Sequence, residues 1–309
     1  MTIQEKLQII QKVTGLTQTK LAERFGVSFV AFSNWWTGKS KPRAKVLNLI
    51  DELYLDVTGQ KTIPEDILTS KKQIILSLSK QHKNLVEEII KNKDIYNEFV
   101  LKLTYHSNGI EGSTLSEADT AAIIFDNVAL SNKTLIEQIE AKNHQTAVDY
   151  LFSYLVKKGR IDEKLILKLH SILMNGIYSD AGSYRRHSVR ITGSNVPTAN
   201  YIKVPDLMKK LFVNIKRKNT DLIKQISVIH SQFEQIHPFP DGNGRTGRLL
   251  MTAMLLKGNI APAVIHKENK QLYYSYLNKS QLKEDFSQLE GFVCDAITEG
   301  FEILERKTI

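Results

Sequence analysis

The segment that most constrains the fold lies near residue 250, where Leu249–Leu256 is apolar except for Thr252. A helix that is apolar on every side is stable only when it is buried. The segment therefore predicts a helix at the centre of a domain. Because so short a run cannot cross a bilayer, we expect no membrane span. It follows directly on a glycine-rich stretch, residues 237–248, so a turn leads into the N-terminus of this buried helix.

Most of the remaining 309-residue chain also follows a helical pattern, since apolar residues recur at spacings of three and four and prolines number only seven. We expect a mainly α-helical protein. Thr58, Gly59 and Pro64 interrupt the pattern. This interruption predicts a small domain over residues 1–60 and a larger domain over residues 61–309.

One segment, residues 182–199, departs from the helical pattern. Val189 and Ile191 alternate with polar neighbours, and Gly193 begins a turn sequence. A short β-hairpin or flap is the expected structure, and a plain surface loop is the alternative.

Charge and cysteine content indicate which kinds of partner the protein binds and in which compartment it works. Lys and Arg total 42 against 33 Asp and Glu, a net charge of +9, which favours an anionic partner such as nucleic acid or a phosphorylated ligand. The single cysteine, Cys294, excludes an internal disulfide and a multi-cysteine zinc site. Glu5 and Lys6 stand where a signal peptide would have its apolar core, so we expect a cytoplasmic protein.

Residues 17–43 predict a helix, a turn at Gly26 and a second helix capped by Ser28. This helix-turn-helix resembles the Cro/repressor-type family, which shares the landmarks Gln18, Leu21-Ala22, Gly26-Val27-Ser28, Trp35, Gly38 and Pro42. The resemblance implies DNA binding through the second helix. The candidate DNA contacts are Gln18, Ser28, Ser33, Asn34, Lys39 and Lys41. The second helix begins with apolar Phe29 and Val30, so a module that contacts protein is the alternative.

The glycine-rich stretch has the residue types of a phosphate site. Gly242 and Gly244 allow close backbone approach at a helix N-terminus, where free N–H groups bind anions. Asn243 can donate an amide hydrogen bond, and Arg245 and Arg248 supply forked cationic donors.

Two further residues of the stretch suit chemistry on that phosphate. Asp241 is a hard oxygen ligand for Mg²⁺, and His237 titrates near neutrality and can serve as general base for a hydroxyl. Residues 242–247 also match G-x-G-x-x-G, but no strand pattern precedes them, and no Gly-Lys-Ser/Thr follows as a P-loop requires.

Residues 237–248 fit the Fic signature H-x-F-x-D/E-G-N-G-R-x-x-R at every fixed position, and the chain resembles that family over roughly residues 90–300. The resemblance implies transfer of AMP from ATP to a Ser, Thr or Tyr hydroxyl of a target protein, or of the protein itself. It implies that His237 deprotonates the hydroxyl, Asp241 holds Mg²⁺ and Arg248 grips the γ-phosphate. The remaining phosphate contacts are implied for Gly242, Asn243, Gly244 and Arg245.

The same resemblance assigns two further regions. Residues 182–199, with Val189, Ile191 and Gly193, would form a flap that docks the target by strand addition. Tyr273 and Tyr274 would border the adenine pocket, and ordinary packing is the alternative for both.

Ser107 and Glu111 lie one turn apart at the end of a helix expected near residues 98–112. A carboxylate at a helix C-terminus is repelled by the negative end of the helix dipole unless a cation pairs with it. The stretch resembles the Fic inhibitory motif S/T-x-x-x-E-G/N, which implies that Glu111 pairs with Arg248 and holds ATP in an unproductive pose. A solvated carboxylate is the alternative.

Several alternatives stay open from the sequence. The same site supports removal of AMP, with Glu111 orienting water, or transfer of another nucleotide. A nucleotide-sensing DNA-binding regulator and a homo-oligomer are also open. Histidines outside the signature lack the spacing of a metal site and are expected to be structural, namely His106, His170, His187 and His230.

Overall fold

The structure, a computed structural model, describes residues 1–58, 63–191 and 195–306. The described residues form α-helices and two short 3₁₀-helices and contain no β-strand. None of their helices has a stretch long and apolar enough to span a bilayer. The predicted mainly α-helical class is confirmed.

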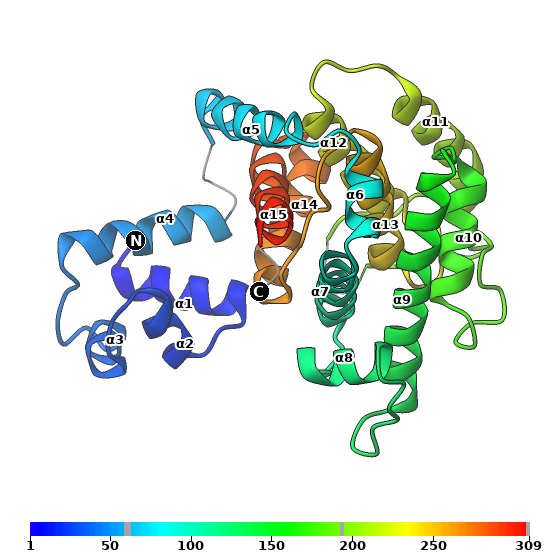
Figure 1. The fold of residues 1–309 in the computed structure, drawn as a ribbon. Coiled ribbons are helices and arrows are strands. Elements are labelled where there is room, and N and C mark those ends of the chain that lie inside the picture. The colour runs from blue at the N-terminus through cyan, green and yellow to red at the C-terminus, as the bar shows by residue number, and fades with distance from the viewer. Residues whose placement is uncertain (59–62, 192–194, 307–309) are drawn as a thin grey trace.

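The first four helices form an N-terminal unit that is set apart from the rest of the chain (Figure 1). The helices are α1 (Ile3–Thr14), α2 (Gln18–Arg24), α3 (Phe29–Trp36) and α4 (Ala44–Val57). Ser28 caps α3 by accepting the N–H of Ala31 at 3.3 Å, as predicted. Leu21 and Phe32 are fully buried between the helices, so this unit has apolar packing of its own.

The larger part of the chain packs its helices around one central helix. The helices are α5 (Glu65–Ser79), α6 (Leu85–Lys91), α7 (Lys93–Glu111), α8 (Glu117–Ile124), α9 (Leu135–Val156), α10 (Glu163–Leu173), α11 (Val204–Lys216), α12 (Leu222–Ile236), α13 (Asn243–Lys257), α14 (Lys270–Lys283) and α15 (Ser287–Glu305). The 3₁₀-helices are η1 (Tyr201–Lys203) and η2 (Lys267–Asn269).

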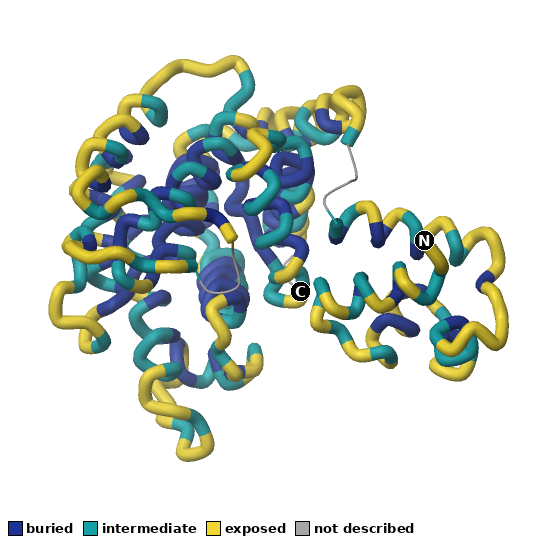
Figure 2. The backbone as a smooth tube through the Cα atoms, turned by 180° about the vertical axis from the view of Figure 1, so that it is seen from behind, coloured by how far each residue is buried: buried dark blue, intermediate teal, exposed yellow. Residues whose placement is uncertain are grey.

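Helix α13 is the predicted central helix. Every residue from Arg245 to Leu256 is buried, and α7, α9, α10 and α12 surround it. Figure 2 shows this concentration of buried backbone in the middle of the larger part. Its N-terminus, with the loop from α12, is therefore held on several sides.

The two parts meet at α14, which contacts α1 and α4. Ser275 of α14 donates its hydroxyl to the carbonyl oxygen of Val57 at 3.2 Å. The predicted boundary at residue 60 falls within residues 59–62, outside the described residues.

The expected β-hairpin is not found: residues 182–191 and 195–199 contain no strand, and Gly193 lies outside the described residues. The physical reason is that side chains occupy the carbonyl groups that a strand ladder would use. Arg185 binds the carbonyl oxygens of His187 and Ala199, and Thr198 Oγ1 binds that of Val189 at 2.8 Å. The two arms of the segment, which include Val189 and Ile191, are therefore joined mainly through side chains.

Candidate active site

His237 ends α12 and begins the loop that leads into α13. Its backbone is left-handed, with φ 51° and ψ 63°, and its N–H donates to the carbonyl oxygen of Phe233 at 3.0 Å. Because a carbonyl only accepts, the ring Nδ1 donates to the Glu234 oxygen at 3.2 Å. The neutral tautomer therefore leaves Nε2 unprotonated and able to accept a proton.

Burial and several nearby charges set the pKa of His237. Burial lowers its pKa below the ordinary value, and Arg185 lowers it further, against the opposing charges of Glu111 and Asp241. His237 is therefore neutral near pH 7, as a general base must be.

The loop after His237 is closed by Asn243. Its Oδ1 accepts the N–H of Phe239 at 2.8 Å, and its Nδ2 donates to the Phe239 oxygen at 2.9 Å. The side chain is buried and shapes the loop rather than pointing an amide at an open phosphate site. Gly242 takes the left-handed φ of 75°, and a Cβ there would lie 2.7 Å from the Met174 sulfur.

The N-terminus of α13 faces the carboxylate of Glu111. A Cβ on Gly244 would lie 2.2 Å from Glu111 Oε1, so only glycine leaves room for that oxygen. Arg248 Nη2 donates to the same oxygen at 2.6 Å, and Arg248 Nε donates to Ser107 Oγ at 2.9 Å. The predicted pairing of Glu111 with Arg248 is thus present, and Ser107 is a further partner of Arg248.

This contact is electrostatically favourable for both partners. Burial raises the pKa of Glu111, but the charge and hydrogen bond of Arg248 outweigh it and hold the pKa below its usual range. Burial opposes the charge of Arg248, and Glu111 raises its pKa again. The carboxylate is therefore an internal anion at the helix N-terminus, where a phosphate would otherwise be attracted.

Arg245 forms its ion pairs with carboxylates other than Glu111. Its Nη1 donates to Glu140 of α9 at 2.7 Å, and its Nη2 lies 3.8 Å from Asp241 Oδ1. The side chain is 3% exposed. Arg245 therefore fixes α13 against α9 and lies beside Asp241.

Asp241 is the only carboxylate of the loop itself. Its side chain is 50% exposed, and its Oδ1 accepts the N–H of Gly242 at 2.6 Å. One accessible carboxylate beside a helix N-terminus suited to phosphate fits Mg²⁺, which is usually bound by one or two carboxylates plus substrate phosphates.

The two tyrosines of α14 differ in their surroundings. Tyr273 is buried, and its hydroxyl lies 2.5 Å from His230 Nε2. Tyr274 is partly exposed, and its ring centroid lies 5.6 Å from that of Tyr273. The packing alternative therefore describes Tyr273, and Tyr274 is the one that can border a ligand.

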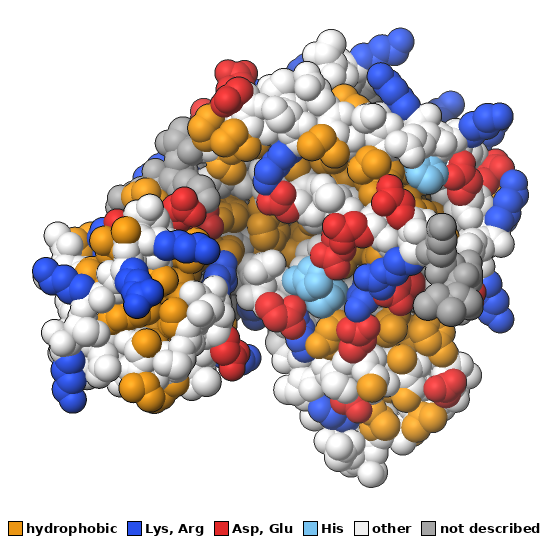
Figure 3. Space-filling model, turned by 60° about the vertical axis from the view of Figure 1, so that its left-hand side comes forward, with side chains coloured by type: hydrophobic (Ala, Val, Ile, Leu, Met, Phe, Trp, Pro, Cys, Tyr) orange, Lys and Arg blue, Asp and Glu red, His pale blue; other side chains and the backbone are white. Residues whose placement is uncertain are grey.

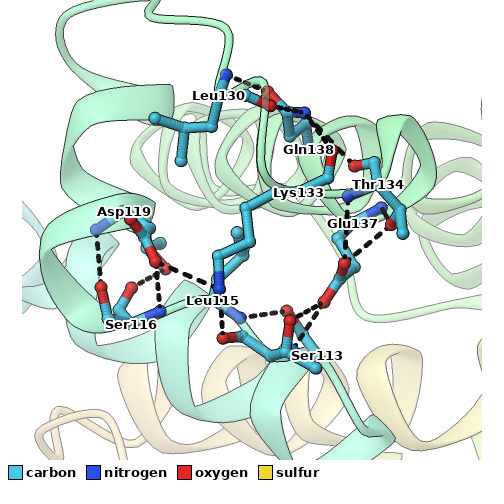
Figure 4. Close-up of polar contacts among 11 residues, drawn as sticks. Ser113, Leu115, Ser116, Asp119, Leu130, Lys133, Thr134, Glu137 and Gln138 are labelled. Carbon is cyan, nitrogen blue, oxygen red and sulfur yellow. Dashed lines mark hydrogen bonds and ion pairs between the residues drawn. The ribbon is translucent and has the colours of Figure 1, made fainter.

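The chain that follows Glu111 is anchored to α9 (Figure 4). Glu137 accepts the N–H of Thr114 at 2.6 Å and its hydroxyl at 2.8 Å, and Lys133 Nζ donates to the Thr114 oxygen at 2.8 Å. Helix α7 itself ends at Gly112, whose φ is 112°. These contacts fix where the end of α7 places Glu111.

Two contributors to the site were missed by the sequence reasoning. Arg185 binds the carbonyl oxygen of His237 at 2.7 Å. His170 accepts the N–H of Gly182 at Nδ1, so its Nε2 donates to the Asp241 oxygen at 3.0 Å. No local pattern could have found either residue, because both lie more than 50 positions from the loop in sequence.

Another histidine cluster lies outside the loop. The potential ligand atoms of His106, His266 and Glu268 all lie within 4.8 Å of one another. His106 Nδ1 already accepts the N–H of Lys267 at 3.3 Å. This bond engages a lone pair that a metal would need, and it favours the predicted structural role of His106.

Residues 160–255, which include the loop from His237 into α13, match the model of the Fic/DOC family. Solved structures agree on the fold: a Fic domain containing signaling protein from Bacteroides thetaiotaomicron has a TM-score of 0.64 at 21% identity, covering 77% of this chain and 99% of that one. Fic-1 from C. elegans has a TM-score of 0.66 at 21% identity, covering 92% and 83%.

Curated relatives carry the name protein adenylyltransferase Fic, that is, a nucleotidyltransferase. The one from Aedes aegypti is 32% identical over 203 residues, which are 64% of this chain and 40% of the relative. The one from Drosophila melanogaster is 31% identical over 193 residues, 62% and 39% respectively. The chain thus spans about two fifths of the length of these relatives.

Proposed function

We propose that the protein is a protein adenylyltransferase that moves AMP from ATP to a Ser, Thr or Tyr hydroxyl of a target protein in the cytoplasm. The observation that carries the proposal is the geometry of His237. Its neutral ring leaves Nε2 unprotonated, on the loop that leads into a helix N-terminus suited to phosphate. The names of the curated relatives support the same activity.

In this proposal each residue of the site has a separate role. His237 Nε2 takes the proton of the attacking hydroxyl, and the new bond forms to the α-phosphorus while pyrophosphate leaves. Asp241 would hold Mg²⁺, which supplies charge neutralisation on the phosphates. Arg248 would bind the γ-phosphate, and Gly244 keeps the helix end open to the anion.

We further propose that Glu111 inhibits the enzyme. Its carboxylate occupies the position next to Gly244 and takes the hydrogen bond of Arg248 Nη2. A γ-phosphate cannot use the same donor while Glu111 remains there. ATP is then bound without the contact between Arg248 and the γ-phosphate that aligns it for attack.

The test measures incorporation of label from α-labelled ATP with Mg²⁺ into the protein and into a cell lysate. Glu111→Gly should increase labelling at least about tenfold over wild type, and adding His237→Ala should abolish it. Glu98→Gln is the matched control, because Glu98 lies on the same helix but contacts Arg306, and it should leave labelling unchanged. If Glu111→Gly gives no labelling with ATP or with other nucleotides, the transferase proposal is contradicted. Release of AMP from a modified protein by water would instead favour the AMP-removing activity.

A second candidate function, DNA binding, rests on the N-terminal unit. Helices α2 and α3 are joined by a turn at Gly26 with φ 66°, as a helix-turn-helix requires. Lys39 and Lys41 are exposed beyond α3, and Ser33 and Asn34 are partly exposed on it. Phe29 and Val30, 49% and 69% exposed at the start of α3, would lie at the same surface.

A further inference from the structure

Arg185 is a buried cation whose hydrogen-bond partners, among the described residues, are all main-chain carbonyl oxygens. Only 2% of the residue is exposed. Its Nε donates to His237 at 2.7 Å, Nη1 to His187 at 2.8 Å, and Nη2 to Ala199 at 2.5 Å and to Ile236 at 3.4 Å.

A buried guanidinium without a carboxylate partner is costly, and the cost is reduced only by well-aligned dipoles. The planar fork of arginine can serve several carbonyl oxygens in fixed directions, which lysine cannot. The arrangement therefore fixes the relative positions of the chain segments that supply those oxygens.

One of these segments is the turn at His237. Arg185 binds the oxygens of Ile236 and His237 through its side chain, and its own backbone N–H donates to the oxygen of Pro238 at 2.9 Å. Three successive carbonyl groups are thus held by one residue. The left-handed φ of His237 is strained for a residue with a Cβ and persists only where the surroundings determine it.

The other segments are the two arms that precede η1. His187 lies in the described arm 182–191, and Ala199 lies in the described arm 195–199. Because one guanidinium binds both arms and the turn, a displacement of either arm changes the anchoring of His237.

We propose that Arg185 is a positioning residue that holds the left-handed turn of His237 and couples it to both arms of the segment 182–199. The proposal rests on the proposed function, since it assigns the geometry of the proposed base. Arg185 also acts on the His237 ring through its charge, because the ring is faced by Glu111 from α7, by Asp241 from its own loop and by Arg185. Removing the charge of Arg185 leaves the two carboxylates less opposed, so the pKa of His237 should rise.

The experiment uses the full chain with Glu111→Gly as the parent, and compares Arg185→Gln, Arg185→Lys and the control Arg186→Gln. Arg186 is the adjacent, exposed arginine. Four quantities are measured: kcat and KM for AMP transfer, binding of a fluorescent ATP analogue, and the pH titration of the His237 ring by NMR, assigned with His237→Gln.

Arg185→Gln should lower kcat about ten- to a hundredfold, since misplacement of a reacting group costs that much, with analogue binding within about twofold of the parent. It should also raise the pKa of the His237 ring. Arg185→Lys keeps the charge but not the fork, so it should lose kcat while the His237 titration stays near that of the parent. Arg186→Gln should change none of these quantities.

The outcomes separate this inference from the proposed function. If Glu111→Gly transfers no AMP, yet Arg185→Gln shifts the His237 titration and Arg186→Gln does not, the transferase proposal fails, whereas the effect of the Arg185 charge on the His237 ring stands. If Glu111→Gly is active and both Arg185 variants fold and retain kcat, the positioning role is wrong. Should Arg185→Gln not fold, the Arg185→Lys variant decides by the same comparison of kcat with titration.

Discussion

Glu234 is a buried carboxyl group beside the proposed base and the inhibitory pair. It lies on α12, is 8% exposed, and its Oε1 has no hydrogen-bond partner among the described residues. A Cβ on Gly247 would lie 2.4 Å from that oxygen, so Glu234 packs directly against α13. Burial raises the pKa of Glu234 to about 8, with Arg248 opposing and Glu111 adding to the shift. The group is therefore protonated at pH 7.

Replacement by glutamine tests this protonation state. The folded-state pKa of about 8 lies above the unfolded value of 4.5, so the stability contributed by Glu234 is full below pH 4.5 and is lost as pH rises through 8. Glu234→Gln should remove this loss, and its melting temperature should exceed that of wild type by at least about 2 °C at pH 8.5. The difference should shrink toward pH 4.5. Equal melting curves at both pH values would show that Glu234 is not held neutral.

Helix α7 presents the inhibitory carboxylate only because its C-terminal end is held in place. Glu137, which caps α9 through Thr134, also binds Thr114, three residues beyond Glu111. The N–H of Thr114 and the Thr134 hydroxyl lower the pKa of Glu137 to about 2. The anchor therefore has its full strength above about pH 4.5 and weakens as pH falls from there toward 2.

Weakening the contact of Glu137 with Thr114 should relieve the inhibition by Glu111 without altering the active site. Glu137→Gln should raise AMP labelling about two- to fivefold over wild type, by increasing the fraction of molecules in which Glu111 has left Arg248. In a Glu111→Gly background it should add nothing. Amide hydrogen exchange over residues 111–116 should quicken, and the exposed Asp126→Asn should behave as wild type. Faster exchange with no change in labelling would show that the anchor does not control Glu111.

The elements that could be predicted from sequence are those whose cause is local. The Ser28 cap, the helix end at Gly112 and the burial of Leu249–Leu256 each follow from a few neighbouring residues, and the structure confirms them. The prediction of a β-hairpin was wrong for a non-local reason. The alternation of Val189 and Ile191 suits a strand, but Arg185 takes the carbonyl oxygens of both arms.

At the scale of the whole molecule, the signature located the site, whereas the fold decided what each of its side chains does. Asn243 and Arg245 carry the right groups for phosphate, yet the first closes the loop and the second pairs with Glu140 of α9. Arg185 and His170 join the site only because distant segments pack beside it. Partners that depend on such packing cannot be read from spacing along the chain.

The N-terminal unit carries the last prediction. Figure 3 shows Lys and Arg side chains among apolar ones on the surface of this unit, at the left of the view. If it binds DNA, the contacts beyond α3 should be made largely with phosphates, which makes affinity fall steeply with salt. Fluorescence anisotropy of a labelled duplex with the full chain should therefore show salt-sensitive binding.

Replacing Lys39 and Lys41 by Gln should weaken that binding and reduce the salt slope by about two, since each lysine would neutralise one phosphate of the duplex. The control is the pair Lys83→Gln and Lys91→Gln, two exposed lysines outside the N-terminal unit, which should change neither quantity. His237→Ala should bind DNA as wild type does, because the proposed base lies in the other part of the chain. Equal weakening by both lysine pairs would instead mean that only net charge attracts the duplex, and the N-terminal helices would then be assigned to protein contact.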